Sequence, residues 1–214
     1  MLTDNTVPIA RKATAERGLS LSADALLQAS RRLDWRFLLP DPNLGRVAYA
    51  GDGQEELVNS LRLFSRSLTV LASPEPGKEA GYDVVVAHAP EPAELAAVAE
   101  LVCPGGYLYV ELYGTGWWLR KGQYKGLRYP AKFMAQLKRF DLCEIHAYWC
   151  WPTFNACTRI IPLDAPSSLR FALSSGQNSA TDRAKAIMVQ GVVRTGLLAW
   201  LVPCFSLVAQ RVMS

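Results

Sequence analysis

Hydrophobic positions follow two alternating periods along the chain, one typical of strands and one typical of helices. Strands are predicted by short apolar runs at residues 46–50, 67–72, 82–87, 107–112, 142–149 and 204–210. Helices are predicted by apolar residues at helical spacing within 22–33, 57–64, 92–102, 130–140, 167–173 and 181–190. The remaining segments are expected to be extended at 34–40, a loop at 162–166 and a flexible linker at 174–180. This alternation predicts an α/β fold, an open and mostly parallel sheet with helices on both faces in three layers.

Two segments refine this topology. Residues 46–72 read strand, glycine turn, helix, strand, and such βαβ units are almost always parallel and right-handed. The β-branched run at 82–87 has the composition of an inner strand buried on both faces. We expect Pro104-Gly105-Gly106 to end the preceding helix before the strand at 107–112 begins.

Composition bounds the class of protein. The chain has 214 residues, 50% of them hydrophobic and 20% charged, which excludes fibrous and largely disordered proteins. The length allows one sizeable core, so we predict a single globular domain with a helical preface at 1–45 and its main part at 46–214.

Compartment is predicted from segments that the chain lacks. Residues 1–32 contain no apolar core of a secretion signal. The odd number of cysteines, 5, indicates reduced thiols, and no Cys-x-x-Cys spacing predicts a metal site. The longest uncharged stretch, 195–210, is broken by Pro203 and is shorter than the roughly 20 residues of a membrane-spanning helix. We therefore expect a cytoplasmic protein without a transmembrane segment.

Charge is unevenly distributed within the net value of +4. Residues 112–140 contain no acidic side chain, and their basic side chains are Arg120, Lys121, Lys125, Arg128, Lys132, Lys138 and Arg139. This basic segment predicts either an anionic partner or a solvated basic face.

Residues 46–111 resemble the class I S-adenosylmethionine-dependent methyltransferases, and a looser likeness continues to the C-terminus. The resemblance depends on the strand that ends in Gly51-Asp52-Gly53, the run Tyr82-Asp-Val-Val-Val-Ala, and the sequence Pro104-Gly105-Gly106 before a strand. The run at 204–210 is similar to the family's last, antiparallel strand. The resemblance implies a methyltransferase-like Rossmann fold.

The same resemblance implies a shortened sheet. Only eight residues separate Ser73 from Tyr82, too few for the helix, third strand and second helix that the family has there. We expect the adenine side of the cofactor site to be open, or to be covered by a protein partner or a second copy of the chain.

The resemblance further implies S-adenosylmethionine as cofactor. Its expected contacts are Gly51, Asp52, Gly53, Ser73 and Glu75. Ser73 stands where the family has an acidic residue for the ribose hydroxyls, and Glu75 is a substitute two residues later. Tyr49 replaces the acidic residue that usually precedes the glycine turn, and Asp52 equally suits a helix cap.

Candidate chemistry gathers after the central strands. His88 ends one strand at the edge where open parallel sheets bind ligands, and is either a general base or a helix cap. The residues expected to bind the acceptor, or else to pack on the protein, are Glu111, Tyr113, Trp117, Trp118, Arg120 and Lys121. The aromatic cluster at 148–154 is expected to be core or a substrate wall.

These observations leave three functional hypotheses. The first is methyl transfer from S-adenosylmethionine to a small-molecule or carbohydrate-like acceptor, which could be anionic. The alternative is a non-catalytic scaffold of the same fold that binds a partner protein or an anionic ligand through the basic loop at 112–140. The third is peripheral membrane contact through 117–128 and the apolar tail. A nucleic acid is not an expected partner.

Overall fold

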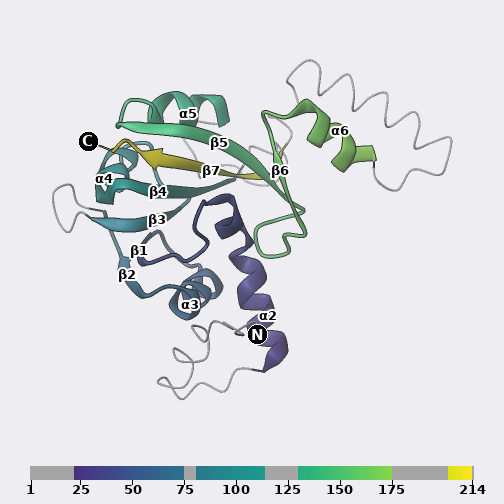
Figure 1. Cartoon of the computed structure of the whole chain (residues 1–214), viewed down its shortest axis with the longest axis horizontal. Helices are drawn as coiled ribbons and strands as arrows, with labels where there is room; N and C mark the ends of the chain where they lie inside the picture. The colour runs from purple at the N-terminus through teal and green to yellow at the C-terminus, as the bar shows by residue number, and fades with distance from the viewer. Residues whose placement is uncertain (1–21, 75–80, 114–129, 175–201, 214) are drawn as a thin grey trace, which may run out of the picture.

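The computed structural model describes residues 22–74, 81–113, 130–174 and 202–213 (Figure 1). Several predictions fall outside these ranges, namely those on Glu75, on Trp117, Trp118, Arg120 and Lys121, and on the helix at 181–190. The statements below concern the described residues.

The elements alternate much as the sequence predicts. In chain order they are α2 (Ala23–Arg32), the 3₁₀-helix η1 (Asp34–Leu38), β1 (Arg46–Ala50), α3 (Glu55–Phe64), β2 (Ser67–Leu71), β3 (Tyr82–His88), α4 (Leu95–Leu101), β4 (Val102–Tyr113), α5 (Pro130–Leu137), β5 (Leu142–Trp151), β6 (Arg159–Pro162), α6 (Pro166–Ser174) and β7 (Cys204–Arg211). Ser22 caps α2, because its hydroxyl accepts a hydrogen bond from the Ala25 amide at 3.2 Å.

The strands form one seven-stranded sheet in the order β2-β1-β3-β4-β7-β5-β6. The pairs β1–β2, β1–β3 and β3–β4 are parallel. Strand β7 lies antiparallel between β4 and β5, as predicted for the closing strand, and β6 is antiparallel to β5. The open, mostly parallel α/β sheet is therefore confirmed.

Each face of the sheet has its own hydrophobic core, which is what three layers require. Along β3, Val85 and Ala87 pack into the core on the side of α4 and α5, whereas Val84 and Val86 pack into the core on the side of α2 and α3. Figure 1 shows α5 on one side of the sheet and α2 and α3 on the other. The central strands are buried on both faces, as the β-branched run predicts.

The two edges of the sheet differ from a full methyltransferase sheet in opposite ways. Strand β2 is an outermost strand and pairs only with β1, in agreement with the predicted loss of the segment that would follow it. The other outermost strand, β6, was not predicted. The sheet thus has seven strands, because β6 adds one at the edge opposite β2, where the family's third strand is missing.

Four local predictions are wrong. Residues 34–38 form η1 rather than an extended segment, because Trp35 turns inward and is almost fully buried. The helix after Pro92 starts only at Leu95, and it ends at Leu101, so that Pro104-Gly105-Gly106 lies inside β4 next to an irregularity in the β3–β4 register. Pro162 ends β6 instead of opening a loop.

No helix among the described residues is both long and apolar enough to span a bilayer. No group of three or more His, Cys, Asp or Glu side chains in those residues could hold a metal ion.

Candidate functional site

Polar side chains gather at the edge where the carboxyl ends of β1, β3 and β4 meet. His88 is the last residue of β3, and it lies opposite Glu111 of β4 in the strand register. Tyr49 and Tyr109 belong to the core on the same face, and Arg32 reaches the edge from the last position of α2. We call Arg32, Tyr49, His88, Tyr109 and Glu111 the edge cluster. Open parallel sheets bind ligands at this edge.

Glu111 is the centre of the edge cluster. Its two carboxylate oxygens accept hydrogen bonds from the Arg32 guanidinium at 2.6 and 2.7 Å. The Nδ1 atom of His88 lies 2.9 Å from Oε2, and the Tyr109 hydroxyl donates to Oε1 at 3.2 Å. The Glu111 side chain has no exposed surface. Four interactions thus converge on one buried carboxylate.

The charges of Arg32 and Glu111 stabilise each other. Burial alone would raise the pKa of Glu111, but the hydrogen bonds from His88 and Arg32 lower it below its usual value. Burial alone would lower the pKa of Arg32, but the hydrogen bond and charge of Glu111 raise it above the usual value. Both groups are therefore ionised in the folded protein, although burying them costs desolvation energy.

An ionised Glu111 fixes the proton arrangement of His88. A carboxylate only accepts hydrogen bonds, so the neutral imidazole donates its Nδ1 proton to Glu111 and keeps the lone pair on Nε2. Among the described residues Nε2 has no hydrogen-bond partner, and His88 remains 8% exposed. This arrangement is that of a general base oriented by a carboxylate.

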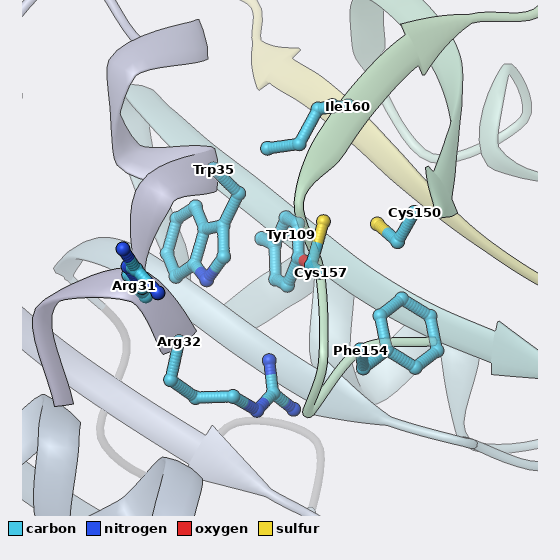
Figure 2. Close-up of a pocket in the computed structure, with 8 residues that line it drawn as sticks. All are labelled: Arg31, Arg32, Trp35, Tyr109, Cys150, Phe154, Cys157 and Ile160. Carbon is cyan, nitrogen blue, oxygen red and sulfur yellow. The ribbon is translucent and has the colours of Figure 1, made fainter. Parts of the chain in front are cut away.

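Arg32 lies beside three aromatic side chains, with which it lines a small cavity. Trp35 of η1 stacks on Tyr109 with ring centroids 3.9 Å apart and an interplanar angle of 10°. The Arg32 guanidinium lies 5.8 Å from the centroid of the Phe154 ring. Figure 2 shows the Arg32 side chain extended toward Phe154, with Trp35 and Tyr109 side by side. The preface at 22–38 therefore contributes directly to the edge cluster.

Three buried polar atoms near this edge have no hydrogen-bond partner within the described part of the chain: Arg32 Nε, Trp35 Nε1 and the Tyr49 hydroxyl. Burial raises the pKa of Tyr49 to about 12, with a further contribution from the charge of Glu111. A cavity of about 10 Å³ lined by Arg32, Trp35, Tyr109 and Phe154 lies among these side chains. That volume suits one water molecule.

The two glycines of the predicted turn, Gly51 and Gly53, have different surroundings. A Cβ on Gly51, at φ +145°, would lie 2.8 Å from the His88 carbonyl oxygen and 2.9 Å from His88 Cβ. Packing against His88 thus accounts for this glycine. At Gly53, with φ +69°, a Cβ would meet no atom within 4 Å. Asp52 does not cap α3, because the N-cap is Gln54, which makes no side-chain capping hydrogen bond.

These observations test the fit of S-adenosylmethionine. Gly53 leaves open space beside the uncapped start of α3, and Glu55 and Glu56 lie exposed in the first turn of that helix. Ser73 follows β2 without a carboxylate beside it in the described segment 71–74. Gly53 therefore leaves room for a ligand at the start of α3, and the expected ribose acceptor is absent from the described segment 71–74.

The predicted acceptor-binding residues separate in the structure. Tyr113, 43% exposed, lies edge-on to His88 at 5.5 Å and to Phe154 at 5.6 Å, measured between ring centroids. Glu111 lies beside His88 but is covered by Arg32, so its carboxylate serves the edge cluster. Trp117, Trp118, Arg120 and Lys121 lie outside the described residues.

Sequence reasoning missed Arg32, Trp35 and Tyr109. For Arg32 and Trp35 the only signal in the sequence is the basic end of an amphipathic helix followed by an aromatic residue, which many surface helices share. Tyr109 is one residue of the apolar run predicted as a strand. The aromatic cluster at 148–154 packs mainly as core: Trp149 enters the core on the side of α5, and Phe154 lies with Cys150 and Cys204.

Comparison of the sequence with known protein families and with curated proteins finds no match. Among solved structures, the chain is similar to a phosphoethanolamine N-methyltransferase 2 of Haemonchus contortus in complex with S-adenosylhomocysteine, at 10% identity and a TM-score of 0.46, over 90% of this chain and 53% of that one. The chain spans about half the length of that enzyme.

Two further solved structures match most of this chain and most of their own length. One is an S-adenosylmethionine-dependent methyltransferase from Archaeoglobus fulgidus, with 10% identity, a TM-score of 0.48, and coverage of 89% of this chain and 95% of that one. The other is a possible histamine N-methyltransferase from Thermotoga maritima, with 11% identity, a TM-score of 0.48, and coverage of 95% and 98%. The fold of the present chain is defined by its own strand order.

Proposed function

We propose that this protein is an S-adenosylmethionine-dependent methyltransferase that acts on a small-molecule or carbohydrate-like acceptor, with His88 as general base. The observation that carries the proposal is the His88–Glu111 pair, with a 2.9 Å contact, at the carboxyl edge of two adjacent parallel strands. An oriented imidazole at this edge is suited to take a proton from an acceptor.

The chain's own residues account for the proton transfer. Glu111 holds Nδ1, so Nε2 faces away from the carboxylate and can accept the proton of an acceptor hydroxyl or amine. The imidazolium that forms is stabilised by Glu111, while Arg32 keeps Glu111 ionised and fixed through two hydrogen bonds. S-adenosylmethionine, when bound, supplies an electrophilic methyl group. Gly53 and Asp52 are the residues that would hold its methionine end.

The acceptor side supports a compact ligand with a flat face. Tyr113 offers an exposed aromatic ring beside His88, and Phe154 supports that ring from behind. Aromatic rings of this kind pack on the faces of sugars and of other rings. The low exposure of His88 requires an acceptor group that protrudes far enough to reach Nε2.

A second candidate function is the non-catalytic scaffold, which a different observation favours. The Glu111 side chain is fully covered and Gly51 packs against His88, so neither residue offers a free surface to a ligand. In the described part of the basic segment, Lys132, Lys138 and Arg139 are exposed on and just after α5, on the opposite face of the sheet. A partner with an acidic surface would bind there.

Calorimetry with S-adenosylmethionine and S-adenosylhomocysteine separates the two functions. The methyltransferase predicts saturable binding of either ligand, and Gly53→Ala should weaken it at least several-fold by filling the open space beside this residue. Gly105→Ala is the matched control, because Gly105 also has positive φ (+77°) but packs near Met213. Absence of binding at millimolar ligand, with the protein folded, would reject the methyltransferase and favour the scaffold.

A further inference from the structure

Three of the five cysteines meet beside the edge cluster. Cys150 lies near the end of β5, Cys157 in the loop that follows, and Cys204 at the start of β7. Cys150 and Cys204 are buried and form a small apolar cluster with Phe154, against which the half-buried Cys157 packs. Residues seven positions apart on a strand would face opposite sides, but the turn after β5 brings Cys157 back to Cys150.

The thiols of Cys150 and Cys157 are neighbours. Both side chains line the same small cavity, and Figure 2 shows their sulfur atoms turned toward each other. The Cys150 Sγ atom also lies 3.7 Å from the Ser206 hydroxyl, and the Sγ atoms of Cys157 and Cys204 donate to the carbonyl oxygens of Arg159 and Cys150 at 3.3 and 3.1 Å. The structure therefore gathers three thiols, of which Cys150 and Cys157 face each other.

The two paired thiols are chemically unequal. The neighbouring Cys150 thiol and the hydrogen bond to the Arg159 carbonyl oxygen lower the pKa of Cys157. The neighbouring Cys157 thiol and burial raise the pKa of Cys150 well above its usual value. Burial raises the pKa of Cys204 to about 12. Cys157 is also the most accessible of the three, so it has the features of the attacking thiol.

We propose that Cys150 and Cys157 are an oxidation site at which hydrogen peroxide converts the thiol pair into a disulfide. The Cys157 thiolate attacks one peroxide oxygen, an S–O bond forms as the O–O bond breaks, and water leaves after protonation. The Cys150 thiol then attacks the sulfenic sulfur, the S–S bond forms as the S–O bond breaks, and a second water leaves. The two thiols lose two electrons in total, which reduce the peroxide.

The bridge would act on the loop that carries Phe154. This loop lies between the two cysteines, and Phe154 contacts both the Arg32 guanidinium and the Tyr113 ring. A disulfide would restrict how far Phe154 can move from these groups. The proposal needs no methyl transfer and stands independently of the proposed function.

Thiol counting on the full chain tests the site. Treatment with hydrogen peroxide at a few equivalents should lower the number of reactive thiols in the unfolded protein from five to three. Peptide mapping without reductant should locate one disulfide between Cys150 and Cys157. Cys157→Ser should retain all four of its thiols under the same treatment, and Cys103→Ser, the matched control, should still lose two.

A measurement on the unaltered protein keeps the test independent of any variant. Limiting iodoacetamide should label Cys157, whose pKa is lowered beside Cys150, before the other half-buried cysteines, Cys103 and Cys143. A bridge between Cys150 and Cys204, oxidation of Cys157 to sulfinic acid without a bridge, or faster labelling of Cys103 or Cys143 would each overturn the proposal.

Discussion

The two histidines of the chain each pair with a carboxylate, in opposite surroundings. His88 Nδ1 lies 2.9 Å from Glu111, with side chains 7% and 0% exposed. His146 Nδ1 lies 3.2 Å from Asp164, with side chains 51% and 55% exposed. The first pair ends two central strands, whereas the second lies on β5 and just after β6 at the periphery of the sheet.

The difference shows that a histidine–carboxylate pair is not special by itself, and that burial distinguishes His88 from His146. Water and salt screen the exposed pair, so it contributes little to stability. The buried pair lacks that screening and requires Arg32 to balance Glu111. Only the buried histidine is held in one orientation by a fixed network. The chain thus contains its own control for each test of His88.

The largest effect is expected when the buried carboxylate loses its charge. Glu111→Gln leaves the Arg32 guanidinium buried without a counter-ion and should lower the free energy of unfolding by about 3–5 kcal/mol. Asp164→Asn should change it by less than about 1 kcal/mol. Urea unfolding followed by circular dichroism measures both.

A double variant sharpens this first test. Arg32→Met combined with Glu111→Leu removes both charges and should recover much of the stability that Glu111→Gln loses. Equal stability losses for Glu111→Gln and Asp164→Asn would show that burial does not distinguish the two pairs.

Catalysis should separate the histidines next. If methyl transfer is the function, His88→Ala should lower turnover by about 10²- to 10⁴-fold and leave the affinity for S-adenosylmethionine almost unchanged. His146→Ala should leave turnover within about two-fold, since His146 lies away from the edge cluster. Transfer of a labelled methyl group provides the measurement, and unaltered turnover in His88→Ala would remove His88 from the mechanism.

The stability of the protein in acid should report Glu111. Its pKa in the folded protein is below the ordinary value of 4.5, so below pH 4.5 the unfolded chain binds the proton first. The stabilisation is complete above that pH and is lost as the pH falls toward the lower folded pKa. Unfolding free energies between about pH 6 and pH 3 should fall less steeply in Glu111→Gln than in the unaltered protein.

The smallest effect on stability is expected from the two tyrosines of the edge cluster, Tyr49 and Tyr109. The Tyr49 hydroxyl has no hydrogen-bond partner in the described residues, so Tyr49→Phe should be neutral or stabilise the protein by up to about 1 kcal/mol. Tyr109→Phe removes a donor to Glu111 and should destabilise it by about 1 kcal/mol or more. Thermal unfolding of the two variants compares them directly, and a loss of stability in Tyr49→Phe would contradict the expectation.

Much of the fold could be predicted because its signals are local. The run at Val84–Val86 and the helical spacing of Leu57 and Leu61 each place apolar side chains on the face that the structure buries. Strand β6 could not be predicted, since four residues that end in proline have no period of their own and pair only because β5 lies beside them. The turn at Asp34–Leu38 likewise depends on a distant partner, Tyr109.

The candidate site was predictable only in part, for the same reason. The positions of His88 and Glu111 follow from where their strands end, and parallel pairing brings them together. The partner of Glu111 does not follow, because Arg32 lies 79 residues earlier in the chain. Nor does the packing of Gly51 on His88, which gives that glycine a structural role in addition to the predicted one.

The bond between Arg32 and Glu111 also decides how the chain can be divided. A fragment that begins at Arg46 would keep every described strand but would leave the Glu111 carboxylate buried without its counter-ion. It would also expose the surface that Leu33, Trp35 and Leu39 cover. We therefore expect residues 22–45 to unfold together with the sheet. A piece trimmed to the strands and their crossover helices should not fold by itself.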